Sequence, residues 1–448
     1  MTTPVEEFIE EARAVTIEEA AERLGLKFTG RRHEHPQPCP VCSGRDTFSF
    51  NTEKNKWNCR HGGVGGQDAI GMAAHVLELD VRRRAGFLEA CAAVTGQEIP
   101  AGGERETDEE RAARHARLEE LRLRHYQEMA EREAGQNAFR DRERQKAQGI
   151  VQHAGALRSS ALCEGRFYLQ RRGCGIPDGD WLRVAADLPY WHGTDDRGQP
   201  LEIYSGPAMV APFIDPGGAV IGCHITWIDL KAAPKFRPVL FGLTRKGVEA
   251  GRAPWRAGDR WPSREDIDAE LYEALATKKM RGTKKGGVIP LAGSPSARRW
   301  LGAEGIENTL AFGRWEEFRA DTFYFAAGDL GNMAGPADPS SRRAHPTLRK
   351  KDKNGRERAV MVPGPVPLFR DGGEPDAMVV PDHVDELVLI GDGDSEPVMT
   401  ASAMVRAKAR HARPGRLVPI IMPRRGTDFA AMLAGHPSAF SYDDEVKA

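Results

Sequence analysis

Leu387-Val388-Leu389-Ile390-Gly391-Asp392-Gly393-Asp394 is a short aliphatic run that ends abruptly at two carboxylates. Ala303-Glu304-Gly305-Ile306-Glu307, much earlier in the chain, has the same form, because an apolar run stops there at an acidic turn. Apolar residues recur at helical spacing after each motif, which predicts that each motif lies between a buried strand and a helix. The two stretches therefore predict an open α/β sheet, in which ligands bind at the carboxyl ends of the strands.

The carboxylates at these strand ends are of the type that binds Mg²⁺, an ion that prefers hard oxygen ligands. Glu304, Asp392 and Asp394 are the candidate catalytic residues and metal ligands. A helix and the apolar run Leu417–Met422 lead to a third acidic turn, at Asp428. Asp428 fits either a further metal ligand or the N-cap of the next helix, and both interpretations stay open.

Composition describes a soluble chain of about three domains. The 448 residues carry a formal net charge of −1, so binding of nucleic acid would need local basic patches. No apolar run reaches the roughly 20 residues of a membrane span, and the acidic N-terminus has no apolar signal core. Seven cysteines with a Cys-x-x-Cys pair indicate a metal site in a reducing compartment, and we expect a cytoplasmic protein.

A zinc ribbon is predicted near the N-terminus. Cys39-Pro40-Val41-Cys42 supplies one knuckle of a tetrahedral zinc site, and Lys56-Trp57-Asn58-Cys59-Arg60-His61 supplies the second. Strand-like runs between the two knuckles predict the hairpin of the ribbon. We expect a structural Zn²⁺ bound by Cys39, Cys42, Cys59 and His61, with His33 or His35 as alternatives for the fourth ligand.

The amino-acid composition changes several times between residues 101 and 384. Glu, Arg and Ala dominate residues 101–150, and opposite charges recur at i,i+3 and i,i+4, which predicts an exposed helical linker. Residues 151–295 predict a mixed α/β segment with a hairpin turn at Pro216-Gly217-Gly218. Residues 328–384 are rich in Pro, Gly and charge, and we expect an inserted surface hairpin or lid there.

The densest basic stretch runs from Lys278 to Gly287. Glycine-rich turns let backbone N–H groups approach an anion, and the lysines and arginine supply positive charge. The spacing does not match an ATPase P-loop, and a solvated loop is the alternative. The candidate nucleotide-binding or nucleic-acid-binding residues are Lys278, Lys279, Arg281, Lys284 and Lys285.

The strand-ending motifs at Glu304 and Asp392–Asp394, followed by Gly426-Thr427-Asp428-Phe429, resemble the Toprim domain. The ribbon, with the turn Gly65–Ile70 into a helix, resembles the zinc-binding domain of DnaG-type primases. The chain departs from that pattern at Gly62, where the family's usual ribbon has its fourth cysteine. The order of elements in the middle segment is similar to the cores of phage- and plasmid-type primases.

This resemblance implies an α/β and α+β multidomain chain. Its parts would be a zinc ribbon with helices (1–100), the charged linker (101–150), the N-terminal half of a primase core (151–295) and a Rossmann-like Toprim domain (296–440). The implied protein is a DNA primase, a nucleotidyltransferase that makes short RNA primers on single-stranded DNA from ribonucleoside triphosphates. Mg²⁺ or Mn²⁺ would be its catalytic ion, and a replicative helicase is an implied partner.

The resemblance also suggests residue roles. Glu304 would bind a metal ion or relay a proton, while Asp392 and Asp394 would bind the ion. Trp57 would stack on template bases, as Phe48 and Phe50 would unless they pack the ribbon instead. A Toprim nuclease and a catalytically weak single-stranded-DNA-binding replication accessory protein are the alternative functions.

Overall fold

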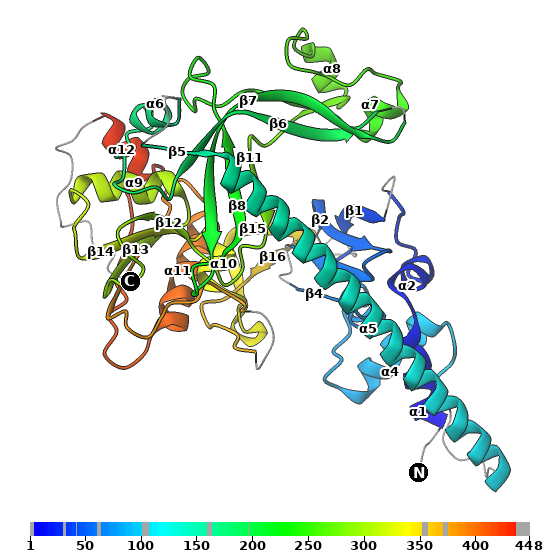
Figure 1. Cartoon of the computed structure of the whole chain (residues 1–448). Coiled ribbons are helices and arrows are strands. Elements are labelled where there is room, and N and C mark those ends of the chain that lie inside the picture. The colour runs from blue at the N-terminus through cyan, green and yellow to red at the C-terminus, as the bar shows by residue number, and fades with distance from the viewer. Residues whose placement is uncertain are drawn as a thin grey trace. The chain divides into compact units, whose positions relative to one another are not determined.

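The computed structural model describes residues 4–29, 33–41, 43–60, 64–100, 107–158, 164–195, 197–351, 357–370 and 375–435 (Figure 1). The chain is a mixed α/β protein with several sheets, and it forms two compact units. The first unit contains Met1–Phe139 and Pro339–Gly364, and the second contains Arg140–Asp338 and Pro365–Ala448. The finer division into four domains stays a prediction. Within the described ranges, no helix is both long and apolar enough to cross a membrane.

The first unit contains a four-stranded antiparallel sheet in the order β1-β2-β3-β4. Alternation along β2 places Phe48 and Phe50 on one face, where both are fully buried in a core shared with helices. Asp68 caps α3 by accepting a hydrogen bond from the Gly71 N–H. The elements are α1 (Pro4–Ala14), α2 (Ile17–Arg23), β1 (Glu34–Cys39), β2 (Ser43–Asn51), β3 (Lys56–Cys59), β4 (Val64–Gly66), α3 (Ala69–Leu77) and α4 (Arg84–Thr95).

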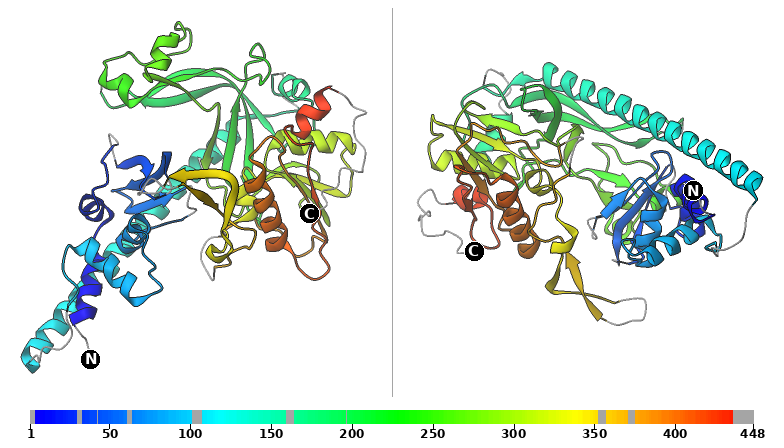
Figure 2. Two further views of the ribbon diagram at one scale, coloured as in Figure 1. Left: turned by 180° about the vertical axis from the view of Figure 1, so that it is seen from behind. Right: turned by 90° about the horizontal axis from the view of Figure 1, so that it is seen from below.

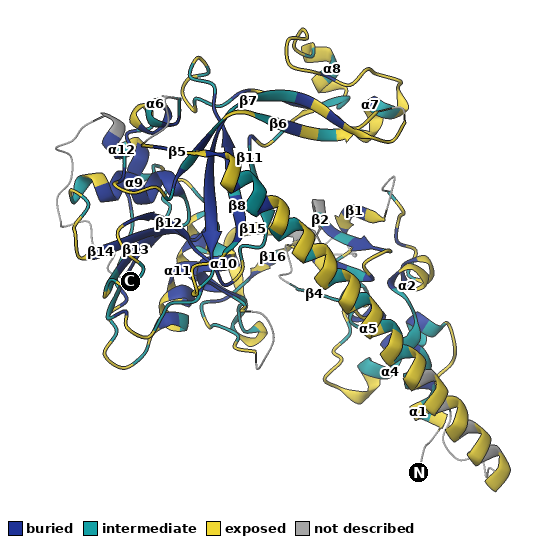
Figure 3. Cartoon of the chain, viewed as in Figure 1, coloured by how far each residue is buried: buried dark blue, intermediate teal, exposed yellow. Residues whose placement is uncertain are grey.

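The predicted charged helix is α5 (Asp108–His153), which passes from the first unit into the second. Ion pairs one turn apart, such as Arg124–Glu120 and Arg132–Glu128, support its exposed surface. Figure 3 shows most of this helix exposed. The first unit also contains a short 3₁₀ helix, Pro339–Ser341, and an antiparallel hairpin, which the right panel of Figure 2 shows as a two-stranded ribbon. Its strands are β15 (Arg343–Lys351) and β16 (Glu357–Val362).

The second unit contains an antiparallel sheet in the order β11-β8-β7-β6-β5. The predicted hairpin at Pro216–Gly218 is present, because β7 ends at Ile214 and β8 begins at Val220. A smaller pair, β9 and β10, and three short helices flank these strands in the sequence. The elements are β5 (Gly155–Ala156), α6 (Glu164–Arg171), β6 (Arg183–Thr194), β7 (Pro200–Ile214), β8 (Val220–Trp227), β9 (Phe241–Leu243), α7 (Arg245–Glu249), α8 (Arg264–Asp268), β10 (Tyr272–Ala274) and β11 (Lys278–Gly282).

A second sheet in this unit has the order β12-β14-β13-β17-β18. Strands β14, β13, β17 and β18 are parallel, and β12 is antiparallel to β14. This is the open α/β sheet that the two acidic motifs predict. The elements are β12 (Ile289–Ala292), β13 (Arg299–Ala303), α9 (Ile306–Trp315), β14 (Thr322–Ala326), α10 (Leu330–Ala334), β17 (Glu386–Ile390), α11 (Pro397–His411), β18 (Ile420–Ile421) and α12 (Phe429–Gly435).

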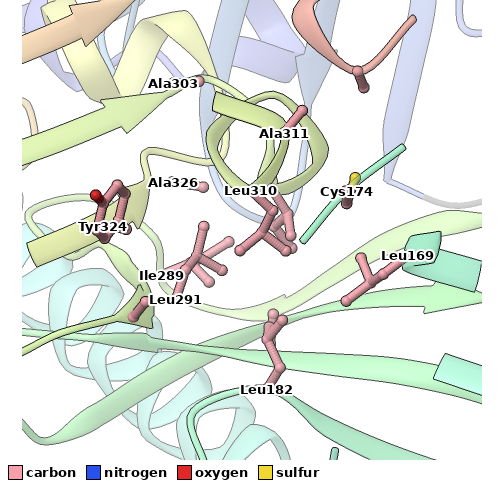
Figure 4. Close-up of a cluster of buried hydrophobic side chains, with 14 of the residues drawn as sticks. Leu169, Cys174, Leu182, Ile289, Leu291, Ala303, Leu310, Ala311, Tyr324 and Ala326 are labelled. Carbon is pink, nitrogen blue, oxygen red and sulfur yellow. The ribbon is translucent and has the colours of Figure 1, made fainter. Parts of the chain in front are cut away.

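The main core of the second unit joins its two large sheets. Figure 4 shows Leu310 of α9 beside Ile289 and Leu291 of β12, with Leu169 of α6 and Leu182 nearby. On the other face of the α/β sheet, Leu387 and Leu389 of β17 pack in a separate cluster with α10 and α11, while Val388 and Ile390 join the main core. Burial on both faces explains why β17 reads as a continuous apolar run.

Candidate functional site

Three carboxylates lie at one edge of the α/β sheet. Strands β13, β17 and β18 are parallel neighbours, so their carboxyl ends meet at the same edge. Glu304 follows β13 directly, Asp392 lies two residues beyond β17, and Asp428 lies between β18 and α12. All three line one cavity of 260 Å³, together with Lys278, Arg172 and His224. Asp394 is exposed and lies beside this group.

The Asp392 carboxyl has a raised pKa. Burial, and then the adjacent Asp394 carboxyl, raises the pKa of Asp392 to about 7. Its Oδ2 atom accepts a hydrogen bond of 3.2 Å from Ser395, whereas its Oδ1 atom is buried and has no hydrogen-bond partner among the described residues. Burial also raises the pKa of Glu304, against the attraction of Lys284. Crowded, partly desolvated carboxylates of this kind are stabilised by a bound cation.

The residues present fit a divalent cation of the Mg²⁺ type. The donors are carboxylate oxygens, one of them unpartnered, and Mg²⁺ usually takes only one or two carboxylates together with waters and phosphate oxygens. Within the described part of the chain, these carboxylates do not converge into a tight group of three ligand atoms. The carboxylates therefore form an open group.

Asp428 caps a helix and also lines the carboxylate cavity, while its role as a metal ligand stays a prediction. Its Oδ1 atom accepts a hydrogen bond of 2.5 Å from the Ala431 N–H, which caps α12. The same side chain lines the carboxylate cavity. A capping carboxylate keeps lone pairs for a second partner, so the cap does not exclude a metal contact.

A buried ionic cluster lies against the cavity. Glu307 is 6% exposed, and its Oε1 atom accepts hydrogen bonds from Lys278 Nζ at 2.6 Å and from Tyr168 Oη at 2.7 Å. Burial opposes ionisation of Glu307, but the attraction and hydrogen bond of Lys278, with the bond from Tyr168, hold the pKa of Glu307 well below its usual range. Glu307 therefore stays charged and fixes Lys278 at the cavity wall.

The basic stretch from Lys278 is a strand over its first half, β11, where the sequence predicts a loop. Alternation along the strand sends its cations to opposite faces of the sheet. Lys278 is paired with Thr226 of β8, and Met280 with His224, on the face of the carboxylate cavity. Lys279 and Arg281 are on the other face, so the structure does not bring them to the carboxylates.

On that other face, Lys279 and Arg281 line a separate cavity of 1270 Å³. The ammonium group of Lys279 lies 3.5 Å from the centre of the Tyr190 ring and donates to the Trp191 carbonyl at 2.9 Å. Arg281 pairs with Glu143 of α5 at 3.5 Å. Both cations are therefore engaged by neighbours within the second unit.

The last two lysines of the stretch differ in position. Lys284 pairs with Asp329, the residue that caps α10, and its charge acts on Glu304. Burial lowers the pKa of Lys284. Lys285 is exposed. Of the five predicted basic residues, Lys278 alone is in the lining of the carboxylate cavity.

A second candidate centre lies in the first unit. Among the described residues, Cys39, Cys59 and His75 form a group whose ligand atoms all lie within 4.8 Å of one another. The two Sγ atoms are 3.6 Å apart, and His75 Nε2 is 3.2 Å from Cys39 Sγ. Tetrahedral zinc with bonds of about 2.3 Å to sulfur and 2.0 Å to nitrogen requires separations of about 3.8 Å between two sulfurs and about 3.5 Å between sulfur and nitrogen. The donor types and spacings therefore fit zinc.

His75 is a candidate ligand that the sequence argument did not name. It lies on α3, well beyond the second knuckle, and no short motif spacing marks it. The predicted ligands Cys42 and His61 lie outside the described residues. The alternatives lie elsewhere in the first unit, because the His35 ring packs on Phe28 and Phe50, and His33 is close to Thr52.

The predicted base-stacking residue Trp57 is 6% exposed. Its ring stacks on His75 at 5.4 Å and lies 6.1 Å from Phe48. Phe48 and Phe50 are fully buried. All three aromatic rings pack in the core of the first unit, which leaves little of their faces for a nucleobase.

The chain matches one family model over part of its length and is similar to several solved structures. A family model described as "Domain of unknown function (DUF7146)" matches residues 141–239. The search of curated proteins found no match. The chain is similar to a structure of the Aquifex aeolicus primase, zinc-binding and RNA polymerase domains, with 14% identity, coverage of 98% of this chain and 83% of that one, and a TM-score of 0.28.

Two further solved structures are similar over part of the chain. A DNA primase domain from Pseudomonas aeruginosa has 11% identity and a TM-score of 0.31, with 66% of this chain and 75% of that one covered. A DnaG primase catalytic domain bound to single-stranded DNA has 12% identity and a TM-score of 0.31, with 67% and 79% covered.

Proposed function

We propose that this chain is a DNA primase, a metal-dependent nucleotidyltransferase whose α/β sheet is a Toprim-type catalytic domain. The observation that carries the proposal is the composition of one cavity. Glu304 and Asp392 enter it from just beyond the ends of β13 and β17, and Asp428 enters it from the turn before α12. Lys278 and Arg172 line it as well. Transfer of a nucleotide needs both groups, because carboxylates hold a divalent ion and cations offset the phosphate charge.

Each residue of the site has a proposed role in nucleotide transfer. Asp392 and Asp394, with Asp428, would hold the divalent ion, which would supply Lewis-acid polarisation of phosphate oxygens. Glu304 would bind a metal ion or take the proton of an attacking 3′-hydroxyl, and the rise of its pKa on burial supports the second role. Lys278, fixed by Glu307, faces the phosphates from the opposite sheet. The substrates are ribonucleoside triphosphates on a single-stranded DNA template.

The test is a primer-synthesis assay with labelled nucleotides, Mg²⁺ or Mn²⁺ and single-stranded DNA of varied sequence. We expect short products from the wild type and at least about 100-fold less from the Asp392→Ala/Asp394→Ala variant, since loss of a metal ion removes several kcal/mol of transition-state stabilisation. A matched control, Asp178→Ala/Asp382→Ala, removes two carboxylates of the same unit whose side chains are 90% and 96% exposed. This control should retain synthesis.

Three results would contradict the proposal in different ways. Degradation of the template that disappears in the Asp392→Ala/Asp394→Ala variant would make the chain a Toprim nuclease. Tight binding of single-stranded DNA with no products on any template would make it an accessory binding protein. Equal synthesis by the wild type and that variant would separate the activity from this cavity.

A further inference from the structure

A further cavity of the second unit is formed by residues 253–272, which include α8, and shares no lining residue with the carboxylate cavity. Its volume is 430 Å³, within the roughly 300–1,000 Å³ of ligand pockets. Three aromatic residues and two prolines are in its lining: Trp255, Trp261, Tyr272, Pro254 and Pro262. Most residues of this segment are exposed (Figure 3), so a large partner can reach the cavity.

The aromatic rings of this cavity are held in place by contacts within the unit. Phe241 of β9 packs edge to face against Trp255 and Trp261, with ring centres 5.8 and 5.9 Å apart. The Tyr272 hydroxyl donates a hydrogen bond of 2.7 Å to the Ala253 carbonyl. Trp255 is 7% exposed, whereas Trp261 is 62% exposed. Trp261 is therefore a supported ring with a large accessible surface, and tryptophans of this kind are frequent anchors of protein interfaces.

The indole N–H of Trp255 lacks an acceptor. Its Nε1 atom is buried and forms no hydrogen bond with any described residue. A buried polar group in a native protein nearly always has a partner, because an unpaired group is costly. The indole nitrogen donates and does not accept, so the partner that it lacks is an acceptor such as a carbonyl oxygen.

The charges in the lining favour a neutral or cationic ligand over an anionic one. Two carboxylates, Asp259 and Asp266, are in the lining with one guanidinium, Arg260. Asp266 is already engaged, because it pairs with Arg252 at 2.6 Å. Asp259 is exposed, and its Oδ2 atom accepts a hydrogen bond of 2.7 Å from the Arg256 N–H. A carboxylate keeps further lone pairs, so Asp259 can also pair with a cation of a ligand.

We propose that this cavity binds a proline-rich segment of a partner protein in the polyproline II conformation. Such a segment has no internal hydrogen bonds, so it presents backbone carbonyls that Trp255 Nε1 can donate to. Proline-rich segments dock in grooves lined by aromatic residues, and this lining is of that type. A basic residue beside the prolines pairs with Asp259. The surface recruits a protein partner and takes no part in the proposed nucleotide transfer.

Calorimetric titration of the full chain with an acetylated decaproline peptide that ends in one arginine tests the site. We expect saturable binding by the wild type and an affinity at least about 10-fold lower for Trp261→Ala, as for a tryptophan anchor. Trp255→Phe keeps an aromatic ring without the N–H donor, and its affinity should fall about 2- to 10-fold. Asp259→Asn should weaken binding about 2- to 5-fold, and only when the peptide carries the arginine.

Trp191→Ala is the matched control, because Trp191 is 43% exposed in the same unit and is not in the lining of this cavity. It should bind the peptide as tightly as the wild type does. A glycine–serine peptide of the same length with the same arginine should bind at least about 10-fold more weakly, since it has no proline rings and loses more conformational entropy. Thermal unfolding of each variant checks the fold.

Single-stranded nucleic acid is the other ligand that stacks on exposed tryptophans, and a parallel titration with a short oligothymidylate separates the two. Loss of peptide affinity in Trp261→Ala with unchanged oligonucleotide affinity supports the proposal. Loss of oligonucleotide affinity alone overturns it. The absence of saturable peptide binding, or equal peptide affinity of the wild type and Trp261→Ala, overturns it as well.

Discussion

Replacement of His75 by alanine is expected to lower the zinc affinity of the first unit by at least about 100-fold, because even indirect partners of metal ligands contribute 10- to 100-fold. His75 Nε2 lies 3.2 Å from Cys39 Sγ, close to the separation that a shared tetrahedral ion imposes. The imidazole also joins two layers, since it projects from α3 while Cys39 and Cys59 are on β1 and β3. Loss of the ion should therefore lower the melting temperature of the unit.

Metal analysis and the absorption spectrum of the Co²⁺-substituted protein measure this effect. His61→Ala is the matched comparison, because the sequence assigns the fourth ligand to His61. We expect His61→Ala to keep more zinc than His75→Ala, and His75→Cys to restore binding with a stronger sulfur-to-cobalt band. Full zinc content in His75→Ala together with loss in His61→Ala would contradict the assignment of His75.

Lys278→Met is expected to destabilise the second unit by about 3–5 kcal/mol, the usual cost of leaving one member of a buried ion pair without its partner. Glu307 is 6% exposed, and after this change the Tyr168 hydroxyl would still donate a hydrogen bond to it, without a neutralising charge from Lys278. The pKa of Glu307 would then rise, because the attraction that opposes its burial is gone. Denaturant unfolding followed by tryptophan fluorescence measures the change.

The double variant Lys278→Met/Glu307→Gln provides the internal control. It removes both charges, so it should be less destabilised than Lys278→Met alone. Lys285→Met removes an exposed charge from the same stretch and should change stability by less than about 0.5 kcal/mol. Equal stability of Lys278→Met and Lys285→Met would show that the Lys278–Glu307 contact does not stabilise the unit.

The local pattern of the sequence predicted the frame of the carboxylate site. The apolar runs before Glu304 and Asp392 are the strands β13 and β17, and the helix expected after Asp394 is α11. A buried parallel strand and the helix that follows it each produce a pattern of apolar residues within a short stretch of sequence. The spacing of those apolar residues is therefore enough to predict them. The Pro216–Gly218 hairpin was predictable for the same reason.

The other side chains of the candidate sites are brought there by contacts between residues that are far apart in the sequence. The spacing of apolar residues does not predict such contacts. Tyr168 reaches Glu307 across the core, and His224 and Arg172 join the cavity from another sheet and helix. Lys278 and Lys279 are neighbours in the sequence, yet strand alternation sends them to opposite faces. His75 likewise reaches the cysteines through the packing of α3 on the ribbon.

Binding of Mn²⁺ at the carboxylate edge is the most direct test of the account, and electron paramagnetic resonance counts the ions without any template. At pH 8 we expect the wild type to bind at least one Mn²⁺ ion that the Asp392→Ala/Asp394→Ala variant does not bind. The pKa of Asp392 is raised to about 7, so a proton competes for the same oxygens and affinity should fall by about tenfold for each pH unit below 7. Equal Mn²⁺ binding by the two proteins at both pH 8 and pH 6 would contradict a divalent-metal site at this edge.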